Sequence, residues 1–257
     1  MKAVIFAGGY GTRLSERTDA IPKPMVEIGG RPILWHIMKI YSHYGVNDFV
    51  ICCGYKQQVI KDYFANFFLY NSDVTIDLSN NSMGIHNSSS ENWRVTLVDT
   101  GLDTFTGGRL KRVQQYVGNE RFFLTYGDGV ADINIEESLA KHIEAGKKLS
   151  MTVYQPQGKL GVVDIDNAGD VKGFIEKPRS GGNWINAGFF VCEPEVFDVL
   201  EGDHEMFEQE PMQKLVSENQ VHAFKHYGFW RPMDTLHDNK ELNKLWNAGN
   251  APWKIWQ

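Results

Sequence analysis

The chain has 257 residues, of which 42% are hydrophobic and 12% aromatic, so it is long enough to bury a sizeable core. Its formal net charge is −6 and it contains no long run of basic residues, which argues against a nucleic-acid partner. No stretch approaches the roughly 18 apolar residues of a membrane span, and the apolar start, which ends at Gly8, is too short for a signal peptide.

The first part of the chain alternates apolar runs that indicate buried strands with amphipathic segments typical of helices. The expected strands are residues 2–7, 48–53 and 121–127, and the expected helices are residues 31–45, 57–68 and 135–146. Such βαβ alternation predicts an α/β fold of Rossmann-like type, with a mixed, mainly parallel sheet and helices on both faces.

The three cysteines lie in or beside these apolar runs. Cys52 and Cys53 are adjacent on an expected strand, so their side chains should point to opposite faces, and no CxxC spacing occurs. We therefore expect Cys52, Cys53 and Cys192 to be small buried hydrophobic residues in a protein of the reducing cytoplasm.

Residues 72–99 interrupt the alternation. Two strand candidates, residues 73–78 and 93–99, flank a run rich in Asn and Ser. This pattern predicts a β-hairpin arm inserted at about residues 70–100, with a mobile polar tip at about 80–91. Because an exposed hairpin edge invites pairing, we expect a homo-oligomer formed through the arm.

A second set of strands with turn signals begins near residue 150. The candidates are residues 150–155, 160–166, 170–177 and 185–192, and they should pair in antiparallel or mixed fashion. A helix near 210–219, a strand at 221–226 and a last helix near 238–247 complete the chain. Since no linker or repeat separates these segments, we expect one domain over residues 1–257.

The loop after the first strand, "GGYGTRL", has the composition of a phosphate-binding loop. It lacks the Lys of the Walker pattern and the third glycine of the dinucleotide fingerprint. Its glycines still let backbone N–H groups approach an anion, and Arg13 adds a charged fork for phosphate oxygens. A tight glycine turn beside a solvated arginine is the alternative.

Lys23 lies in "PKPM", within a dozen residues of that loop. The two flanking prolines restrict the backbone, and the residue before a proline favours an extended conformation. The ammonium of Lys23 should therefore be held in place, and a shared polyanion explains both motifs. An ordinary surface lysine in a proline turn is the alternative.

Two carboxylates stand in short irregular stretches. Asp128 lies between glycines at the end of a buried strand, and Asp234 precedes the last expected helix. If they meet in space, they would form a Mg²⁺ site completed by water and phosphate oxygens. Taken singly, Asp128 could be a turn residue and Asp234 a helix cap.

Over nearly its full length the chain resembles the sugar-nucleotide pyrophosphorylases, which are nucleotidyltransferases acting on sugar 1-phosphates. The resemblance is carried by "AGGYGTRL" followed by "IPKPM", and continues through "TGGRLKRV", "TYGDGVADI", "NAGFFV", "EQEPM" and "FWRPMDTLHDNKEL". Within that family, the order of the motifs is similar to that of the cytidylyltransferase branch. The weakest stretch is the polar run at residues 79–92.

The resemblance implies a set of site residues. The implied nucleotide-binding residues are Phe6, Ala7, Gly8, Gly9, Tyr10, Gly11, Thr12, Arg13, Lys23, Thr104, Arg109 and Asp128. The implied sugar-phosphate-binding residues are Glu176, Lys177, Asn186 and Gly188. Lys23, Arg13 and Asp128 would be catalytic, and Asp128 and Asp234 would bind Mg²⁺.

The implied reaction joins CTP and α-D-glucose 1-phosphate into CDP-glucose and pyrophosphate. The base is not fixed by any motif, so UTP, dTTP or another phosphate-monoester acceptor remain alternatives. A non-catalytic sugar-nucleotide sensor would be expected to lack Arg13, Lys23 or Asp128, and all three are present. A purely structural protein assembled through the arm leaves the glycine loop unexplained.

Overall fold

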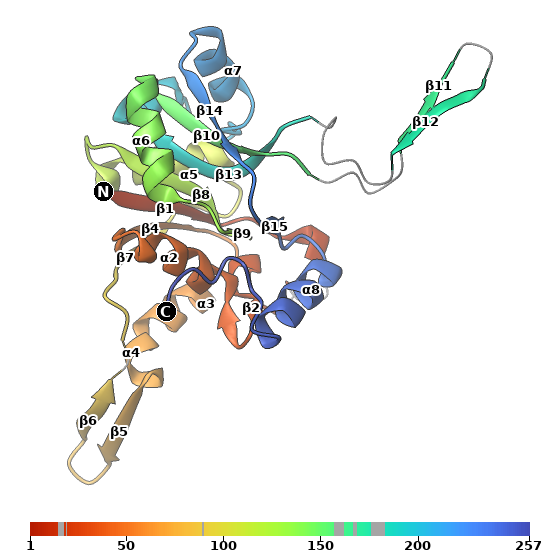
Figure 1. Ribbon diagram of the computed structural model, residues 1–257. Helices are drawn as coiled ribbons and strands as arrows, with labels where there is room; N and C mark the ends of the chain where they lie inside the picture. Colours follow the sequence, from red (N-terminus) through yellow and green to blue (C-terminus); the bar gives the residue numbers. More distant parts are fainter. Residues whose placement is uncertain (15–17, 19, 89, 157–161, 167–168, 176–182) are drawn as a thin grey trace.

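The computed structural model describes residues 1–14, 18, 20–88, 90–156, 162–166, 169–175 and 183–257. Among these residues, it describes the backbone but not the side chains of Arg13, Ser88, 162–165, 174 and 175. A seven-stranded sheet with the order β14-β10-β13-β8-β1-β4-β7 forms its centre (Figure 1). Its strands are β1 (Lys2–Ala7), β4 (Asp48–Cys53), β7 (Arg94–Asp99), β8 (Phe122–Tyr126), β10 (Leu149–Tyr154), β13 (Ile185–Cys192) and β14 (Val221–His226). Only β13 pairs in antiparallel fashion with its neighbours, so the predicted mainly parallel sheet is confirmed.

Two hydrophobic clusters cover the two faces of this sheet. Strand β1 shows the division, because Ala3 and Ile5 belong to one cluster while Val4 and Phe6 belong to the other. The first cluster takes residues from α2 (Ile33–His43), α3 (Gln57–Ala65), α6 (Ile135–Ala145) and α8 (Leu236–Asn247). The second takes residues from α5 (Thr106–Val117), η3 (Pro194–Val199) and α7 (Glu210–Ser217). Helices on both faces are therefore confirmed.

The cysteines follow the same division. Cys52 lies in the second cluster and Cys53 in the first, and both are fully buried and unpaired, as is Cys192. Burial raises the pKa of the Cys53 thiol to about 12, which keeps it protonated and unreactive. None of the helices in the described part of the chain has the length and apolar character needed to span a bilayer.

The arm differs from the expectation in its second strand. Strand β5 (Ser72–Asp77) follows the short helix α4 (Phe67–Tyr70) and pairs with β6 (Ser82–Ser88), with Ile76 opposite Met83 and Val74 opposite Ile85. Residues 93–99, expected in the arm, instead form β7 at the edge of the central sheet, parallel to β4. The arm is thus a hairpin of residues 72–88, which projects from the body (Figure 1).

The segment after residue 150 divides into two parts. β10 and β13 join the central sheet, whereas β11 (Val162–Ile165) and β12 (Val171–Ile175) form a separate antiparallel hairpin. The expected mixture of antiparallel strands is confirmed here. Two further small pairs, β2 (Glu27–Ile28) with β3 (Arg31–Pro32) and β9 (Gly129–Ala131) with β15 (Trp230–Pro232), complete the sheets.

Candidate active site

A cavity of about 440 Å³ opens at the carboxyl end of β1. It is lined by eleven of the twelve residues expected to bind the nucleotide: Phe6, Ala7, Gly8, Gly9, Tyr10, Gly11, Thr12, Lys23, Thr104, Arg109 and Asp128. The twelfth, Arg13, lies in the short 3₁₀ helix η1 (Thr12–Leu14), and its side chain is outside the described part of the structure. Ligands of open α/β sheets bind at such strand ends.

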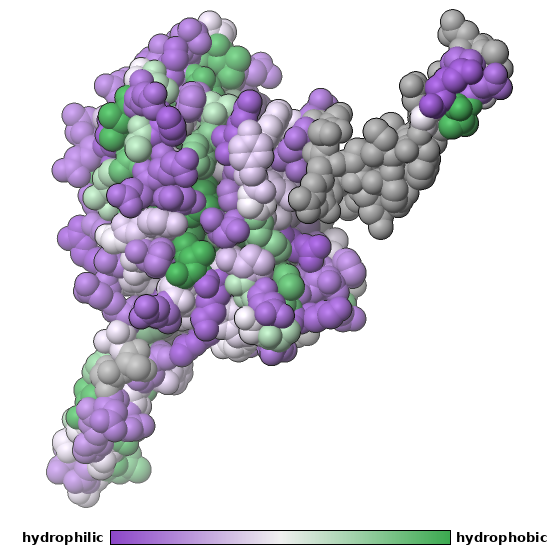
Figure 2. All heavy atoms as spheres, in the orientation of Figure 1, coloured by the Kyte–Doolittle hydropathy of each residue, from purple (hydrophilic) through white to green (hydrophobic). Residues whose placement is uncertain are grey.

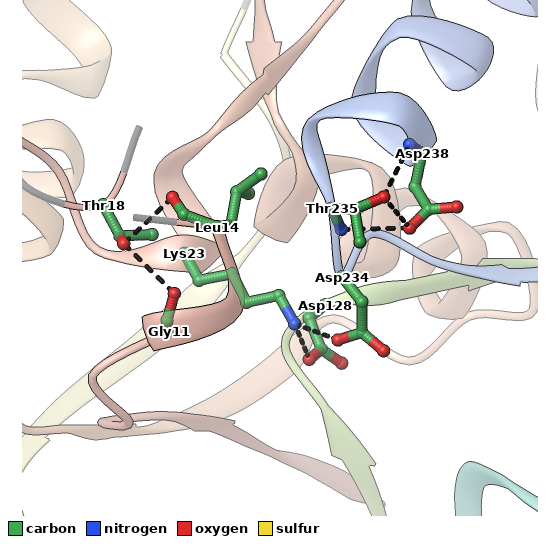
Figure 3. Close-up of polar contacts among 8 residues, drawn as sticks. All are labelled: Gly11, Leu14, Thr18, Lys23, Asp128, Asp234, Thr235 and Asp238. Atoms are coloured by element: carbon green, nitrogen blue, oxygen red, sulfur yellow. Dashed lines mark hydrogen bonds and ion pairs between the residues drawn. The ribbon is translucent and has the colours of Figure 1, made fainter. Parts of the chain in front are cut away.

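The glycine loop is anchored by its neighbours rather than being a free turn. Gly11 has φ = 66°, which favours glycine, and its carbonyl accepts a hydrogen bond from the Thr18 hydroxyl at 3.1 Å (Figure 3). The same hydroxyl donates to the Leu14 carbonyl at 3.1 Å. These bonds link the carboxyl-terminal part of the loop to Thr18.

Arg109 supports this loop from beneath. Arg109 is 4% exposed, and its guanidinium donates hydrogen bonds to the hydroxyl of Thr100 and to four carbonyl oxygens, those of Gly8, Cys53, Gly101 and Leu102, at 2.7–3.3 Å. The expectation from the sequence was a nucleotide contact, and Arg109 does line the cavity. The bonds of its guanidinium, however, tie three chain segments together.

That bonding accounts for Gly8. A Cβ added at Gly8 would lie 2.2 Å from the guanidinium nitrogen Nη1 of Arg109. Any side chain at this position would push the arginine away from the carbonyls that it joins. Burial lowers the pKa of Arg109, but an arginine stays charged at ordinary pH, so a positive charge lies under the loop.

Lys23 is the central charge of the site (Figure 3). Its Nζ donates to Oδ2 of Asp128 at 2.7 Å and to Oδ1 of Asp234 at 2.6 Å, and its side chain is 10% exposed. Burial opposes its charge, yet the two carboxylates outweigh burial and raise the pKa of Lys23 above its usual value. The expected pairing of Asp128 with Asp234 in space is thus present, with the ammonium between them.

The backbone at Lys23 departs from the extended conformation expected before a proline. Pro22 is extended, and Lys23 begins the 3₁₀ helix η2 (Lys23–Met25). Backbone hydrogen bonds from Met25 N to the Pro22 carbonyl at 2.8 Å and from Val26 N to the Lys23 carbonyl at 3.1 Å close this turn. The stiffness expected from the prolines comes from this hydrogen-bonded turn.

The β9–β15 pair brings the two aspartates together. Gly129 pairs with Pro232, and Met233 N donates to the Asp128 carbonyl at 2.8 Å, so the residues beside the pair face each other. Asp234 is not the cap of α8. Thr235 fills that role in a reciprocal capping box with Asp238, which leaves the Asp234 carboxylate directed to Lys23 (Figure 3).

A second cavity, of about 250 Å³, shares Tyr126 and Asp128 with the first. Asn186 and Gly188, expected to bind the sugar phosphate, line it together with Asp234. The other two expected sugar-phosphate residues, Glu176 and Lys177, lie outside the described residues. Asp128 therefore stands where the two cavities meet.

Sequence reasoning assigned no role to Tyr126 and Glu208. The Tyr126 hydroxyl donates to Oε1 of Glu208 at 2.6 Å and accepts from Nδ2 of Asn186 at 3.2 Å, while Thr106 donates to Oε2 of Glu208 at 2.7 Å. Burial, followed by the charge of Glu208, raises the pKa of Tyr126 and keeps its hydroxyl a donor. The motif "EQEPM" contains Glu208, but nothing in its local pattern points to a tyrosine far away in sequence.

The donor set at Lys23 fits a hard divalent cation. Within the described residues no three His, Cys, Asp or Glu side chains form a metal-binding group. Two carboxylates that converge on one cation are nonetheless what Mg²⁺ uses when substrate phosphates supply further ligands. The residues present therefore fit the metal implied by the resemblance, provided that phosphates complete its shell.

Comparison with known proteins identifies the family. The nucleotidyl transferase family model matches residues 2–246, which is most of the chain. The protein belongs to the nucleotidyl transferase family.

Particular relatives are similar over their whole length. The chain is 55% identical to the glucose-1-phosphate cytidylyltransferase of Salmonella typhimurium (strain LT2), with 100% of both chains covered. It is 44% identical to a probable glucose-1-phosphate cytidylyltransferase of Bacillus subtilis (strain 168), again over 100% of both. The solved structure of HddC from Yersinia pseudotuberculosis in complex with GMP-PN has a TM-score of 0.69 at 22% identity, covering 95% of this chain and 99% of that one, which supports the fold alone.

Proposed function

We propose that this protein is a glucose-1-phosphate cytidylyltransferase that converts CTP and α-D-glucose 1-phosphate into CDP-glucose and pyrophosphate. The observation that carries the proposal is the 55% identity, over the full length of both chains, to a relative with that activity. Two cavities that share Asp128 and Tyr126 support it, because the reaction needs two substrates side by side.

The reaction is a substitution at phosphorus. An oxygen of the sugar phosphate attacks the α-phosphorus of CTP in line, and the bond to the bridging oxygen of pyrophosphate breaks. The attacking oxygen is already anionic, so no base has to remove a proton. Catalysis then consists of positioning and charge stabilisation, for which the rigid loop and the buried cations are suited.

Each group has a role in this scheme. The backbone of Gly8 to Thr12 would bind the triphosphate, Lys23 would stabilise charge at the α-phosphate, and Arg13 would stabilise the leaving pyrophosphate. On the acceptor side Asn186 and Gly188 line the smaller cavity and would bind the sugar, with Glu176 and Lys177 as further proposed contacts.

Asp128 and Asp234 are the residues that would hold Mg²⁺. When bound, such an ion neutralises phosphate charge. The two aspartates would contribute only their carboxylate oxygens, and the β9–β15 pair brings the two backbone segments that carry them together.

A substrate panel tests the proposal. CTP, UTP, dTTP and GTP are each combined with glucose 1-phosphate, mannose 1-phosphate and inorganic phosphate, and pyrophosphate release is measured. We expect CTP with glucose 1-phosphate to give the highest kcat/KM. A higher value for another pair would replace the assigned substrates, and ligand binding without turnover of any pair would favour the sensor.

We also propose that residues 1–257 form one domain and self-associate through the β5–β6 arm, and that the protein acts in the cytoplasm. The arm exposes Ile76, Leu78, Met83 and Ile85, which are 58%, 84%, 55% and 43% exposed. Figure 2 shows hydrophobic surface along this projection. The three unpaired buried cysteines support a reducing compartment.

A further inference from the structure

Lys23 and a divalent cation compete for the same oxygens. The ammonium is bound at 2.7 and 2.6 Å by one oxygen from each of the two carboxylates that fit the metal. The Lys23 side chain is 10% exposed, whereas the side chains of Asp128 and Asp234 are 31% and 26% exposed. Lys23 is therefore the most buried of the three side chains, and both aspartates line a cavity.

The two cations cannot remain together between these carboxylates. A divalent ion placed there would lie a few ångströms from the ammonium, and like charges repel strongly at that distance in a partly buried site. Without either cation, Asp128 and Asp234 would face each other as two negative charges. One cation has to replace the other.

We infer that Lys23 is an internal substitute for the metal. Its ammonium holds the two carboxylates together until the metal arrives, and it must leave them before the metal can bind. The inference rests on the metal-binding role of the aspartates in the proposed function. A polyphosphate gives the displaced ammonium new oxygen partners, because Lys23 lines the larger cavity. Metal and triphosphate should consequently bind cooperatively, and the metal alone should bind weakly.

This inference predicts a gain of affinity on removing a positive side chain. Mn²⁺ binding without nucleotide is measured by electron paramagnetic resonance for the wild type, Lys23→Met and Lys39→Met. We expect Lys23→Met to bind Mn²⁺ about tenfold more tightly or better, within the range of roughly 5- to 150-fold typical of coupled sites. Lys39 is a matched control, since it is 19% exposed and pairs with the single carboxylate of Glu91. Unchanged, weaker or absent Mn²⁺ binding in Lys23→Met would overturn the inference.

Stability in excess chelator gives the complementary result. Lys23→Met should have a lower Tm than the wild type, and adding Asp128→Asn to it should restore part of the loss, because the repulsion between two carboxylates disappears. An equal or higher Tm for the single variant in chelator would count against the substitute role.

A measurement on the wild type covers the possibility that Lys23→Met does not fold. Acetylation of lysines by acetic anhydride is followed by mass spectrometry, with and without saturating Mg²⁺. Lys23 should react severalfold faster with Mg²⁺, while Lys39 keeps its rate. An unchanged Lys23 rate at saturating metal would contradict the exchange.

These outcomes separate the inference from the proposed function. Mn²⁺ binding requires neither CTP nor sugar phosphate, so tighter binding by Lys23→Met would stand even if the substrate panel failed. Conversely, CDP-glucose formation by the wild type together with unchanged metal affinity in Lys23→Met would reject the substitute role and leave the activity intact.

Discussion

Lys23 is the residue at which binding and catalysis should separate most clearly. The backbone of the glycine loop binds ground state and transition state alike to a first approximation, whereas an ammonium beside the α-phosphorus acts where charge redistributes. Removing a positioned donor of this kind costs on the order of 10²–10³ in kcat. We therefore expect Lys23→Ala to lower kcat by about that factor and to change KM for CTP less.

Steady-state kinetics on Lys23→Ala and Lys23→Arg provide the measurement. Lys23→Arg should rescue poorly, because a guanidinium is broader than an ammonium and less point-like. A raised KM with kcat untouched in Lys23→Ala would reduce Lys23 to a simple binding contact.

Arg109 should matter to stability as well as to the loop. A lysine at position 109 offers three N–H donors for the five oxygens that the guanidinium contacts, so at least two acceptors lose their bond. Because a hydrogen bond from a charged group contributes about 1.5–3 kcal/mol, Arg109→Lys should lower the free energy of unfolding by about 2 kcal/mol or more. Chemical denaturation measures this loss.

The control for Arg109 is its neighbour on the same helix. Arg112 forms an exposed ion pair with Asp203, with side chains 42% and 43% exposed, and such pairs contribute about 1 kcal/mol or less. Equal losses for Arg112→Lys and Arg109→Lys would mean that the buried bonds of Arg109 add nothing to stability.

Metal removal tests the two aspartates. Activity should vanish in excess chelator and return with Mg²⁺, and Asp128→Asn should lose most of it, because a neutral amide is a poorer ligand for a hard cation. Asp48→Asn, which alters an aspartate at the start of β4 that pairs with Arg94, serves as the control. Full activity of Asp128→Asn in excess chelator would contradict the proposal that the two carboxylates bind a catalytic metal ion.

The residues that sequence reasoning found and missed differ in how far their partners lie along the chain. The glycine loop and Lys23 could be found because their signals lie in short stretches of sequence. Glycines permit unusual φ angles and close backbone approach, and prolines flank Lys23. Whether Asp128 meets Asp234 depends on the β9–β15 pair, which joins segments about a hundred residues apart. The longest-range hydrogen bonds of Arg109, and the one between Tyr126 and Glu208, also join residues that are distant in sequence. No local sequence pattern predicts them.

At the level of elements, apolar periodicity predicted the central strands, most helices and the first strand of the arm, but it missed the second strand of the arm. Residues 93–99 and 73–78 both read as strands, and proximity in sequence suggested that they pair. β6 carries Met83 and Ile85 in alternation, but the surrounding Asn and Ser hid that signal. Because β6 pairs with β5, β7 is free to pair with β4 at the edge of the central sheet.

Helix α2 contains a histidine that should make stability depend on pH. His36 is fully buried; its Nε2 donates to the Ile28 carbonyl at 2.9 Å, and its Nδ1 accepts from Trp253 at 3.4 Å, which requires the neutral ring. Burial lowers the pKa of His36 to about 4, against about 6.5 in the unfolded chain. As pH falls from 6.5 to 4, only the unfolded state takes up this proton, so folding loses up to about 3 kcal/mol.

Comparison of the wild type with a variant that lacks His36 isolates the contribution of this residue to the pH dependence of stability. The free energy of unfolding is measured from pH 7.5 to pH 4 for the wild type and for His36→Gln, which does not titrate. We expect the difference in free energy of unfolding between the wild type and His36→Gln to be largest above pH 6.5 and to decrease as pH falls. A difference that stays constant over this range would show that His36 does not stay neutral in the fold.

Across the whole molecule, the apolar surface is divided between a closed body and an open arm. The two clusters of the body bury their large side chains, whereas Val74, Ile76, Met83 and Ile85 lie on one face of a two-stranded hairpin that projects away from both. An isolated hairpin is at best marginally stable in water. A second copy of the chain would cover this face and pair with its free edges.

The double variant Ile76→Asp with Ile85→Asp should therefore lower the oligomeric order of the protein, as measured by sedimentation velocity. The thermal unfolding of the body should shift little, because neither residue belongs to its clusters. Ile143→Asp is the matched control, since Ile143 is 55% exposed on α6 and Ile76 is 58% exposed on the arm. If the double variant and the control sediment alike, and both like the wild type, the arm does not join subunits, and its apolar face needs another partner.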